Sequence, residues 1–378
     1  MRRLVAESRL VRIVRLSEKG RITQFVTYVE PQIRTKRMPW KWAPPLLVFV
    51  SPTPSPNLEV LHRFKKFAFF VFSSSRPTWY RIADGLAYSR YVRAFRWRKP
   101  FIEWQKAWEY RSRHGVVQRS DEYSTDQLLA DLGLDPRRPV VLLSLRDPAY
   151  YRALQGSERS LPSGREVTSE TDVRNPEIES YRGAVSFLAQ RNFSVVRVGV
   201  DVLPLDQSWR SILADYGSAL RTDRSDVLLA RRARFLLNGA SGFWAIAAIF
   251  DTPQVSTNMY APFFGSGVFG RDVFAPQLRR VIATGNMQTF REMAATAWKY
   301  SYESNLERDA VKLVKNKSEE IVELVVEMLA RLDGSFHETK ADVKRRERFE
   351  EIRNLSTGVW ERGRIGTAFL RRYEHLLD

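Results

Sequence analysis

The chain has 378 residues, a formal net charge of +18 and no cysteine. A chain of this length is too long to fold around one hydrophobic core, so we expect about two domains. The lack of cysteine excludes disulfides and thiolate metal sites. The apolar runs are far shorter than the roughly 20 residues of a membrane span, and the N-terminal stretch lacks the apolar segment and cleavage site of a signal peptide.

The basic excess lies mainly in the first third of the chain, where residues 90–115 interleave Arg and Lys with Trp, Tyr and Phe. Such a mixture suits an anionic membrane surface, with Trp97, Trp104 and Trp108 at headgroup depth. It suits single-stranded nucleic acid less well. An amphipathic helix that packs its aromatic side chains inward stays an open alternative. We expect peripheral membrane contact through residues 90–111 and no nucleic-acid partner.

The first part of the chain has the pattern of an α/β domain. Residues 22–33 and 44–52 are predicted as strands, with Glu30 near a strand end, and residues 57–67 as a helix. At 128–139 a helix end is followed by Gly-Leu-Asp-Pro, which is typical of a linker. We therefore expect three parts: an N-terminal α/β domain at 1–133, a C-terminal α/β domain at 134–340, and a helical tail at 341–378 that packs back on the domains.

Strands and helices alternate after this linker. Cap-like residues predict helix starts at Asn175-Pro176, Ser225-Asp226 and Ser241-Gly242, and a longer helix ends at Gly334. Such alternation predicts an open parallel sheet with helices on both faces, and two Rossmann-like domains that face a cleft. A continuous apolar run predicts a strand buried on both faces at residues 139–145, and further strands are predicted at residues 193–199, 235–238 and 253–258.

Polar clusters lie near the carboxyl ends of these strands, where parallel sheets bind ligands. Arg146 and Asp147 end the first strand, and a guanidinium is a planar fork that matches a phosphate. The Asp would orient the Arg or bind a sugar hydroxyl, whereas an Arg–Asp pair that ties down a loop is equally open. Asp172, Arg174 and Asn175 precede a helix start, whose free N–H groups attract anions. Asn175 is also explained as a helix cap.

A third cluster is the turn that contains Asn238, Ser241 and Gly242. Small residues there let backbone amides and the Ser241 hydroxyl approach a diphosphate closely. The alternative is a tight turn that needs glycine for its backbone. Because three clusters follow neighbouring strands, together they predict a donor-binding site.

No residue spacing indicates a metal or a dinucleotide site. The four histidines are scattered, no Asp-x-Asp occurs, and residues 265–270 match G-x-G-x-x-G without the helix that such a site needs. Without a metal, arginines and a helix N-terminus must stabilise the charge on a leaving nucleoside diphosphate. We therefore expect metal-independent glycosyl transfer, with Arg146 at the phosphate. Glu30 is a candidate base for the acceptor hydroxyl, and a structural Glu there is the alternative.

Four blocks of the sequence, in this order, resemble a family of proteins regarded as bacterial glycosyltransferases: SLRDPAYY (144–151), TDVRNPEIESYRGAVSFLAQRNFSVVRVG (171–199), SDVLLARRARFLLNGASG (225–242) and RIGTAFLRRY (364–373). That family is distantly similar to fucosyltransferases of the two-domain GT-B-like fold. The resemblance implies that Arg146 grips the donor phosphate and that the Ser241 turn faces the same diphosphate. Two positions depart from the pattern, because Gln24 stands where a histidine is expected and Ala240 where a serine is expected.

The function that this resemblance implies is a glycosyltransferase of hexosyl or fucosyl type in bacterial surface polysaccharide or glycoconjugate synthesis. Its partners would be a nucleotide-sugar donor and a glycan or lipid-linked acceptor, with no cofactor. The expected place is the cytoplasm, including the inner face of the cell membrane. Because Gln24 cannot act as a base, a sugar-nucleotide epimerase of the same fold and a non-catalytic nucleotide-sugar-binding protein stay open as alternatives.

Overall fold

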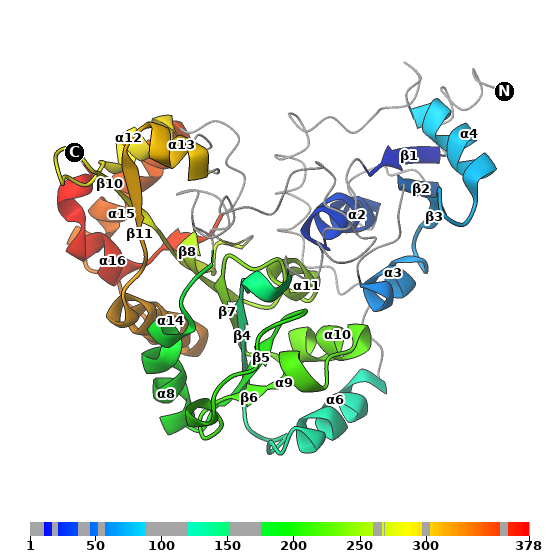
Figure 1. Cartoon of the computed structure of the whole chain (residues 1–378), viewed down its shortest axis with the longest axis horizontal. Coiled ribbons are helices and arrows are strands. Elements are labelled where there is room, and N and C mark those ends of the chain that lie inside the picture. The colour runs from blue at the N-terminus through cyan, green and yellow to red at the C-terminus, as the bar shows by residue number, and fades with distance from the viewer. Residues whose placement is uncertain are drawn as a thin grey trace.

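The computed structural model describes residues 11–16, 22–36, 46–51, 57–87, 120–150, 175–259, 267, 269–296, 303–355 and 362–377. Within these ranges the chain forms two parallel sheets with helices packed against them (Figure 1). The expected α/β fold class, with two parallel-sheet units and C-terminal helices, is therefore confirmed.

The N-terminal unit is a three-stranded parallel sheet in the order β1-β2-β3. Strand β2 and helix α3 match their predictions, but the predicted strand at 22–33 is wrong. Those residues form a helix because Phe25, Val26, Val29 and Ile33 recur every three or four positions and are all buried. The elements are β1 Val11–Arg15, α2 Ile22–Lys36, β2 Leu46–Ser51, α3 Leu58–Phe64, β3 Phe69–Phe72 and α4 Pro77–Ala87.

The second unit is a seven-stranded sheet in the order β12-β9-β8-β7-β4-β5-β6, in which each pair is parallel. The four predicted strands are β4, β5, β7 and β8, and each is buried along its whole length. The strands are β4 Val140–Leu145, β5 Ser194–Val198, β6 Ala214–Asp215, β7 Phe235–Gly239, β8 Gln254–Met259, β9 Val273–Pro276 and β12 Arg364–Ile365. A separate antiparallel pair consists of β10 Leu278–Val281 and β11 Val311–Val314.

Helices cover both faces of the larger sheet. Alternate residues of β4 belong to two different hydrophobic clusters, one shared with α10 and α11 and the other with α8 and α14. The helices of this part are α6 Ser120–Asp131, α8 Arg182–Gln190, α9 Tyr216–Ala219, α10 Asp223–Arg232, α11 Trp244–Ile249, α12 Phe290–Ala295, α13 Glu303–Arg308, α14 Ser318–Asp333, α15 Lys340–Leu355 and α16 Thr367–Arg372. Three short 3₁₀ turns are Ile178–Tyr181, Gln207–Trp209 and Glu374–Leu376.

Three predicted helix starts shift by a few residues. The chain stays extended after Asn175, and Glu177 occupies the cap position, so Asn175 is not the helix cap. Helix α10 is capped by the Thr222 hydroxyl, which accepts from the Ser225 amide, so Ser225 lies inside the helix. Helix α11 begins at Trp244, after the Ser241-Gly242 turn. The predicted end of α14 is confirmed, with Gly334 in the left-handed region at φ 74°.

The C-terminal helices pack onto the second unit. Helix α15 packs against α12, and α16 packs against α14 and α15 (Figure 1). The same part of the chain also supplies β12, an edge strand that the sequence did not predict. The residue limits of the three expected parts stay predictions.

The two units share one buried junction. Helix α2 packs against α11 and α3 packs against α10, so that Phe25 and Phe64 belong to the same core cluster as Leu229 and Ile246. The α3–α10 contact also carries polar bonds, since the Leu58 amide donates to Asp223 Oδ2 at 2.7 Å. The sheets are thus joined through packed helices, while the expected cleft between them stays a prediction.

Candidate functional site

Two of the three predicted clusters meet where β4 and β7 end side by side. The strands pair in register, with Ser144 opposite Asn238. The Ser144 hydroxyl donates to Ser241 Oγ at 2.9 Å, and the Ser241 amide donates to Asn238 Oδ1 at 3.2 Å. The Arg146 amide donates to the Gly239 carbonyl at 3.2 Å. The carboxyl edge of the sheet therefore gathers Arg146, Asn238 and Ser241, as the sequence predicted.

The described part of the remaining cluster lies against the same turn. A Cβ atom at Gly239 would lie 2.6 Å from the Tyr181 hydroxyl and 3.0 Å from Pro176 Cγ, so the stretch after Asn175 presses on this glycine. The next residue, Ala240, has φ 54°, which a serine would also find strained. Glycine at 239 is thus needed for close packing. Asp172 and Arg174 lie outside the described residues, so their roles stay predictions.

Asp147 is occupied by structural contacts. Its Oδ2 accepts from Arg197 Nη2 at 2.9 Å and from the Leu203 amide at 3.1 Å, and Oδ1 accepts from the Ala149 amide at 2.9 Å. Arg197 is buried on β5 and also donates to the Leu203 carbonyl at 2.6 Å. Asp147 therefore ties down a loop, as one interpretation held, but its arginine partner is Arg197. A further role with the sugar stays a prediction.

Asn238 is the buried donor of this edge. Its side chain is 1% exposed, and among the described residues its Nδ2 has no hydrogen-bond partner. Ser256 lies opposite Asn238 on β8, and its hydroxyl likewise lacks a partner within the described ranges. Buried polar groups are almost always hydrogen-bonded, so this row has unused bonding capacity. Ser144 and Ser256 were not predicted as site residues, although polar residues inside apolar strands are a visible signal.

The opposite face of the same strand ends is a closed polar network. The Tyr181 hydroxyl is bonded to Thr257 Oγ1 at 2.7 Å and accepts from Asn258 Nδ2 at 3.0 Å. Burial raises the pKa of Tyr181 to about 12, so the phenol stays protonated near neutral pH. This network holds the Gly239 turn in place and offers no acid or base for the reaction.

The turn also lies at the junction of the two units. A Cβ atom at Gly242 would be 3.3 Å from Thr23 Cγ2 and 3.5 Å from Ile22 Cγ2, in the first turn of α2. The first N–H groups of a helix lack intrahelical partners and carry a partial positive charge, and α2 has 15 residues. Gln24, where the family pattern expects a histidine, belongs to this same turn. The N-terminal unit thus brings a helix start to the edge of the larger sheet.

Glu30 lies inside helix α2 and not near a strand end, which corrects its predicted position. It is fully buried, and Arg34 Nε contacts its Oε1 at 2.7 Å. Arg34 also pairs with Asp251 at 3.0 Å and donates to the carbonyls of Ala248 and Ile249 at the end of α11. This geometry favours the structural alternative for Glu30. Its role as a base stays a prediction that the contacts do not support.

Other predicted features can be placed only in part. The basic, Trp-rich segment at 90–111 and half of residues 265–270 lie outside the described ranges. Within the described ranges, no group of three His, Asp or Glu side chains is arranged to hold a metal ion. No helix among these residues is both long and apolar enough to cross a membrane.

Comparison with known proteins gives fold-level likeness only. The sequence matches no protein-family model and no curated protein. Similar solved structures include a glycosyl transferase family 9 protein from Veillonella parvula DSM 2008 (11% identity, 67% of this chain and 82% of that chain, TM-score 0.40). Another is the E. coli ADP-heptose lps heptosyltransferase II (13% identity, 66% of this chain and 85% of that chain, TM-score 0.36).

A third similar structure is the E. coli heptosyltransferase WaaC with ADP (9% identity, 71% of this chain and 91% of that chain, TM-score 0.34). The three proteins are glycosyltransferases, but identities and TM-scores this low carry no argument about the activity of this chain. They also lend no support to a fucosyl-type specificity, so the resemblance to fucosyltransferases stays a prediction.

Proposed function

We propose that this chain is a glycosyltransferase that moves a sugar from a nucleoside-diphosphate sugar to an acceptor hydroxyl. The observation that carries the proposal is the meeting of Arg146, Asn238 and Ser241 at one sheet edge, beside the first turn of α2. These residues, and not the distant structural likeness, support it.

The chemistry of the edge fits the leaving group of such a reaction. Negative charge grows on the nucleoside diphosphate as the glycosidic bond breaks, and fixed donors lower the energy of that state. Arg146 offers a forked guanidinium that is half-buried at the end of β4. Asn238 Nδ2 offers a buried amide donor, and the start of α2 adds partial positive charge. Each acts on a phosphate oxygen.

The proposal also covers the metal requirement, the acceptor and the cellular location. We propose transfer without a metal, because the residue types at the edge can stabilise the negative charge of a phosphate directly. The proposed acceptor is a glycan or lipid-linked hydroxyl in bacterial surface polysaccharide or glycoconjugate synthesis, at the inner face of the cell membrane. No described carboxylate in this edge is placed to act as the base. The base therefore comes from elsewhere in the chain or from the acceptor complex.

The test is nucleotide binding by Arg146→Ala. Wild-type protein should be stabilised against heat by at least one of ADP, GDP, UDP and CDP, because a ligand bound only by the folded state raises stability. Loss of one charge-assisted hydrogen bond should weaken that nucleotide by roughly 1.5 to 3 kcal/mol, about 10- to 150-fold. Arg137→Ala removes an exposed arginine far from the edge and serves as the control, with unchanged affinity.

Product analysis with a panel of nucleotide sugars then separates the alternatives. Transfer to an acceptor or slow donor hydrolysis supports the proposal, isomerisation of the donor indicates an epimerase, and binding alone indicates a non-catalytic protein. If no nucleotide stabilises the wild-type chain, or if Arg146→Ala binds as tightly as Arg137→Ala, the site assignment is wrong.

A further inference from the structure

Helix α4 carries apolar side chains on two neighbouring faces, one packed and one exposed. Tyr80 and Ala83 face the smaller sheet, where they pack against Ile13 and neighbouring valines of β2. Trp79 directly precedes Tyr80, and Ile82 directly precedes Ala83. These two side chains are 64% and 51% exposed. A helix that only covers a sheet would have polar residues at such outer positions. The outer face of α4 is therefore apolar without a partner among the described residues.

Phe69 extends this apolar surface onto the edge strand β3. It pairs in register with Val48 of β2, and paired residues of parallel strands point to the same face of a sheet. Val48 packs under α4, so Phe69 projects on the α4 side. The helix does not reach it, since Phe69 is 65% exposed. Phe69, Trp79 and Ile82 thus lie on one side of the N-terminal unit, and we call them the α4 patch.

The surroundings of the α4 patch are basic. Lys65, Lys66, Arg76 and Arg81 are exposed, and none of them forms an ion pair with any described residue. Between Glu59 and Asp84 the sequence has no carboxylate residue, and Glu59 is already paired with the buried Arg63.

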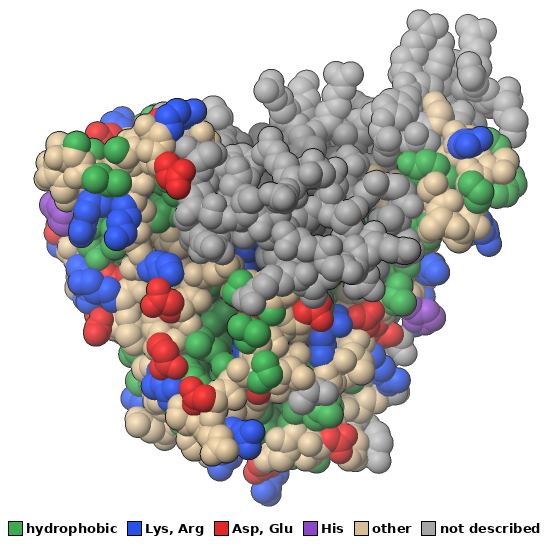
Figure 2. Space-filling model, viewed as in Figure 1, with side chains coloured by type: hydrophobic (Ala, Val, Ile, Leu, Met, Phe, Trp, Pro, Cys, Tyr) green, Lys and Arg blue, Asp and Glu red, His purple; other side chains and the backbone are tan. Residues whose placement is uncertain are grey.

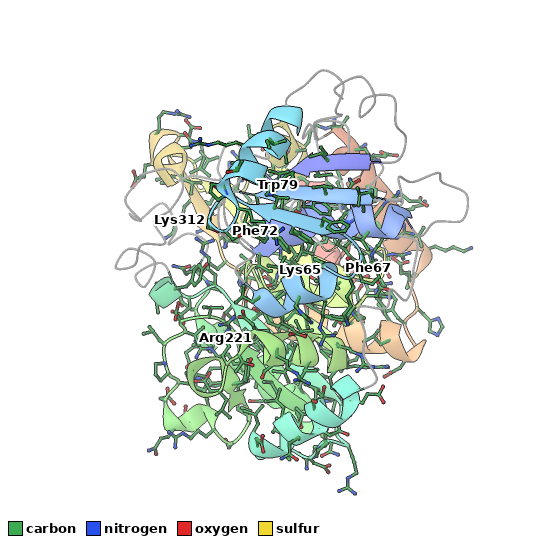
Figure 3. All side chains as sticks on the ribbon, turned by 90° about the vertical axis from the view of Figure 1, so that its right-hand side faces the viewer. Lys65, Phe67, Phe72, Trp79, Arg221 and Lys312 are labelled. Atoms are coloured by element: carbon green, nitrogen blue, oxygen red, sulfur yellow. The ribbon has the colours of Figure 1, made fainter. Side chains whose placement is uncertain are left out.

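The views of the molecule show basic side chains near the patch. Figure 2 shows a basic side chain among hydrophobic ones over α4, at the upper right. In Figure 3, Trp79 and Lys65 both lie on the side turned to the viewer. Cations that form no ion pair with a described residue therefore lie on the same side of the N-terminal unit as the apolar side chains.

We propose that the α4 patch binds the surface of an anionic phospholipid bilayer. Tryptophan partitions to headgroup depth, isoleucine and phenylalanine enter the acyl boundary, and arginine and lysine pair with lipid phosphates. Charge complementarity selects an anionic over a neutral bilayer. A protein partner would need its own apolar site, and the patch has no carboxylate or amide to orient one. This surface is separate from the sheet edge described above and goes beyond the proposed activity.

The contact is peripheral and salt-sensitive. Each cation near an anionic surface contributes about 1 kcal/mol, which is about fivefold in affinity, and this attraction is screened within a Debye length. Two cations therefore account for about thirtyfold. Apolar insertion is not screened by salt, so both parts are needed for a bound state that is stable at physiological ionic strength.

Co-sedimentation of the full chain with vesicles tests the proposal. The anionic probe is a vesicle of phosphatidylcholine with about 30% phosphatidylglycerol. The neutral probe is a vesicle of pure phosphatidylcholine. The apolar test variant is Trp79→Ala with Ile82→Ala, and its control is Ile282→Ala, which removes a similarly exposed side chain elsewhere. The charge test variant is Arg76→Glu with Arg81→Glu. Its control, Arg137→Glu with Arg138→Glu, makes the same net-charge change on exposed residues.

The proposal expects binding to the anionic vesicles only. The affinity for these vesicles should fall at least thirtyfold in the charge variant and about tenfold in the apolar variant. Both controls should keep wild-type binding, and melting curves should show that all variants are folded, since the changed side chains are exposed. Equal losses in test and control variants would mean that overall charge drives binding, which overturns the assignment. Unchanged binding of both test variants also overturns it. Concentration-dependent self-association that is abolished by the apolar variant would assign the patch to a second copy of the chain instead.

Discussion

The buried arginine at the junction of the two units gives the sharpest stability prediction. Arg34 is fully buried, pairs with Glu30 and Asp251, and donates to two carbonyls at the end of α11. Arg34→Met would leave the Glu30 carboxylate buried without its cation. Breaking a buried ion pair from one side costs about 3–5 kcal/mol. We therefore expect a loss of this size in the free energy of unfolding, measured in urea by circular dichroism.

A double variant separates the pair from its surroundings. Glu30→Leu with Arg34→Met removes both charges, so the remaining loss comes from the two uncapped carbonyls and amounts to about 1–2 kcal/mol. Asp251 loses its cation as well, but a quarter of its side chain is exposed, so water solvates this carboxylate in part. The double variant should thus be more stable than Arg34→Met alone, by about 2 kcal/mol.

The same variants decide the role of Glu30. If Glu30 is structural, the double variant keeps glycosyl transfer once its stability is matched by a lower assay temperature. Arg137→Met is the control for the loss of an exposed arginine, and it should leave unfolding unchanged. An Arg34→Met variant as stable as the wild type would refute the reasoning, and so would a double variant less stable than the single one.

Three further outcomes are expected. Gly239→Ala should unfold at a lower temperature and a lower urea concentration, since its Cβ would lie 2.6–3.0 Å from atoms of Tyr181, Leu145 and Pro176. An unchanged melting temperature would show that the turn can move to accommodate the methyl group. Transfer activity should survive excess EDTA, and a loss restored by manganese or magnesium would disprove the metal-free proposal. Burial raises the pKa of Asp226 to about 6, above its unfolded value near 3.9, so its stabilising contribution is present at low pH and decreases as pH rises from about 4 to 6. The stability of wild type relative to Asp226→Asn should fall over that range, and a flat difference would contradict it.

Much of the larger sheet could be predicted because its strands are buried on both faces. Continuous apolar runs such as residues 140–145 have few alternatives to a central parallel strand. The carboxyl ends of such strands lie along one edge, so the clusters at Arg146 and Ser241 were expected to meet, and they do. The helix at 22–36 was missed because β-branched residues such as Val26 and Val29 favoured a strand, while the helical spacing of the buried positions went unweighed.

The rest depended on contacts between distant parts of the chain. Asp147 bonds to Arg197 across a gap of 50 residues, so nothing near Asp147 indicated that partner. The structural role of the Glu30–Arg34 pair depends on two carbonyls of α11 and on Asp251, which follows this helix. Strand β12 has two residues, which is too short for any pattern of alternation. Contacts between residues far apart in the sequence decide between structures that the local sequence fits equally well. Such contacts cannot be read from a single sequence.

The position of β12 has a consequence for how the protein folds during synthesis. Its residues, Arg364 and Ile365, pair with Val273 and Phe274 of β9. The outer edge of the larger sheet can therefore form only after about 90 residues beyond β9 have been synthesised. Until then β9 offers open backbone groups along a fully buried, apolar strand, which is a template for pairing with another chain. A chain that ends before residue 364 would keep this edge open and should aggregate, whereas all three strands of the smaller sheet are made by Phe72.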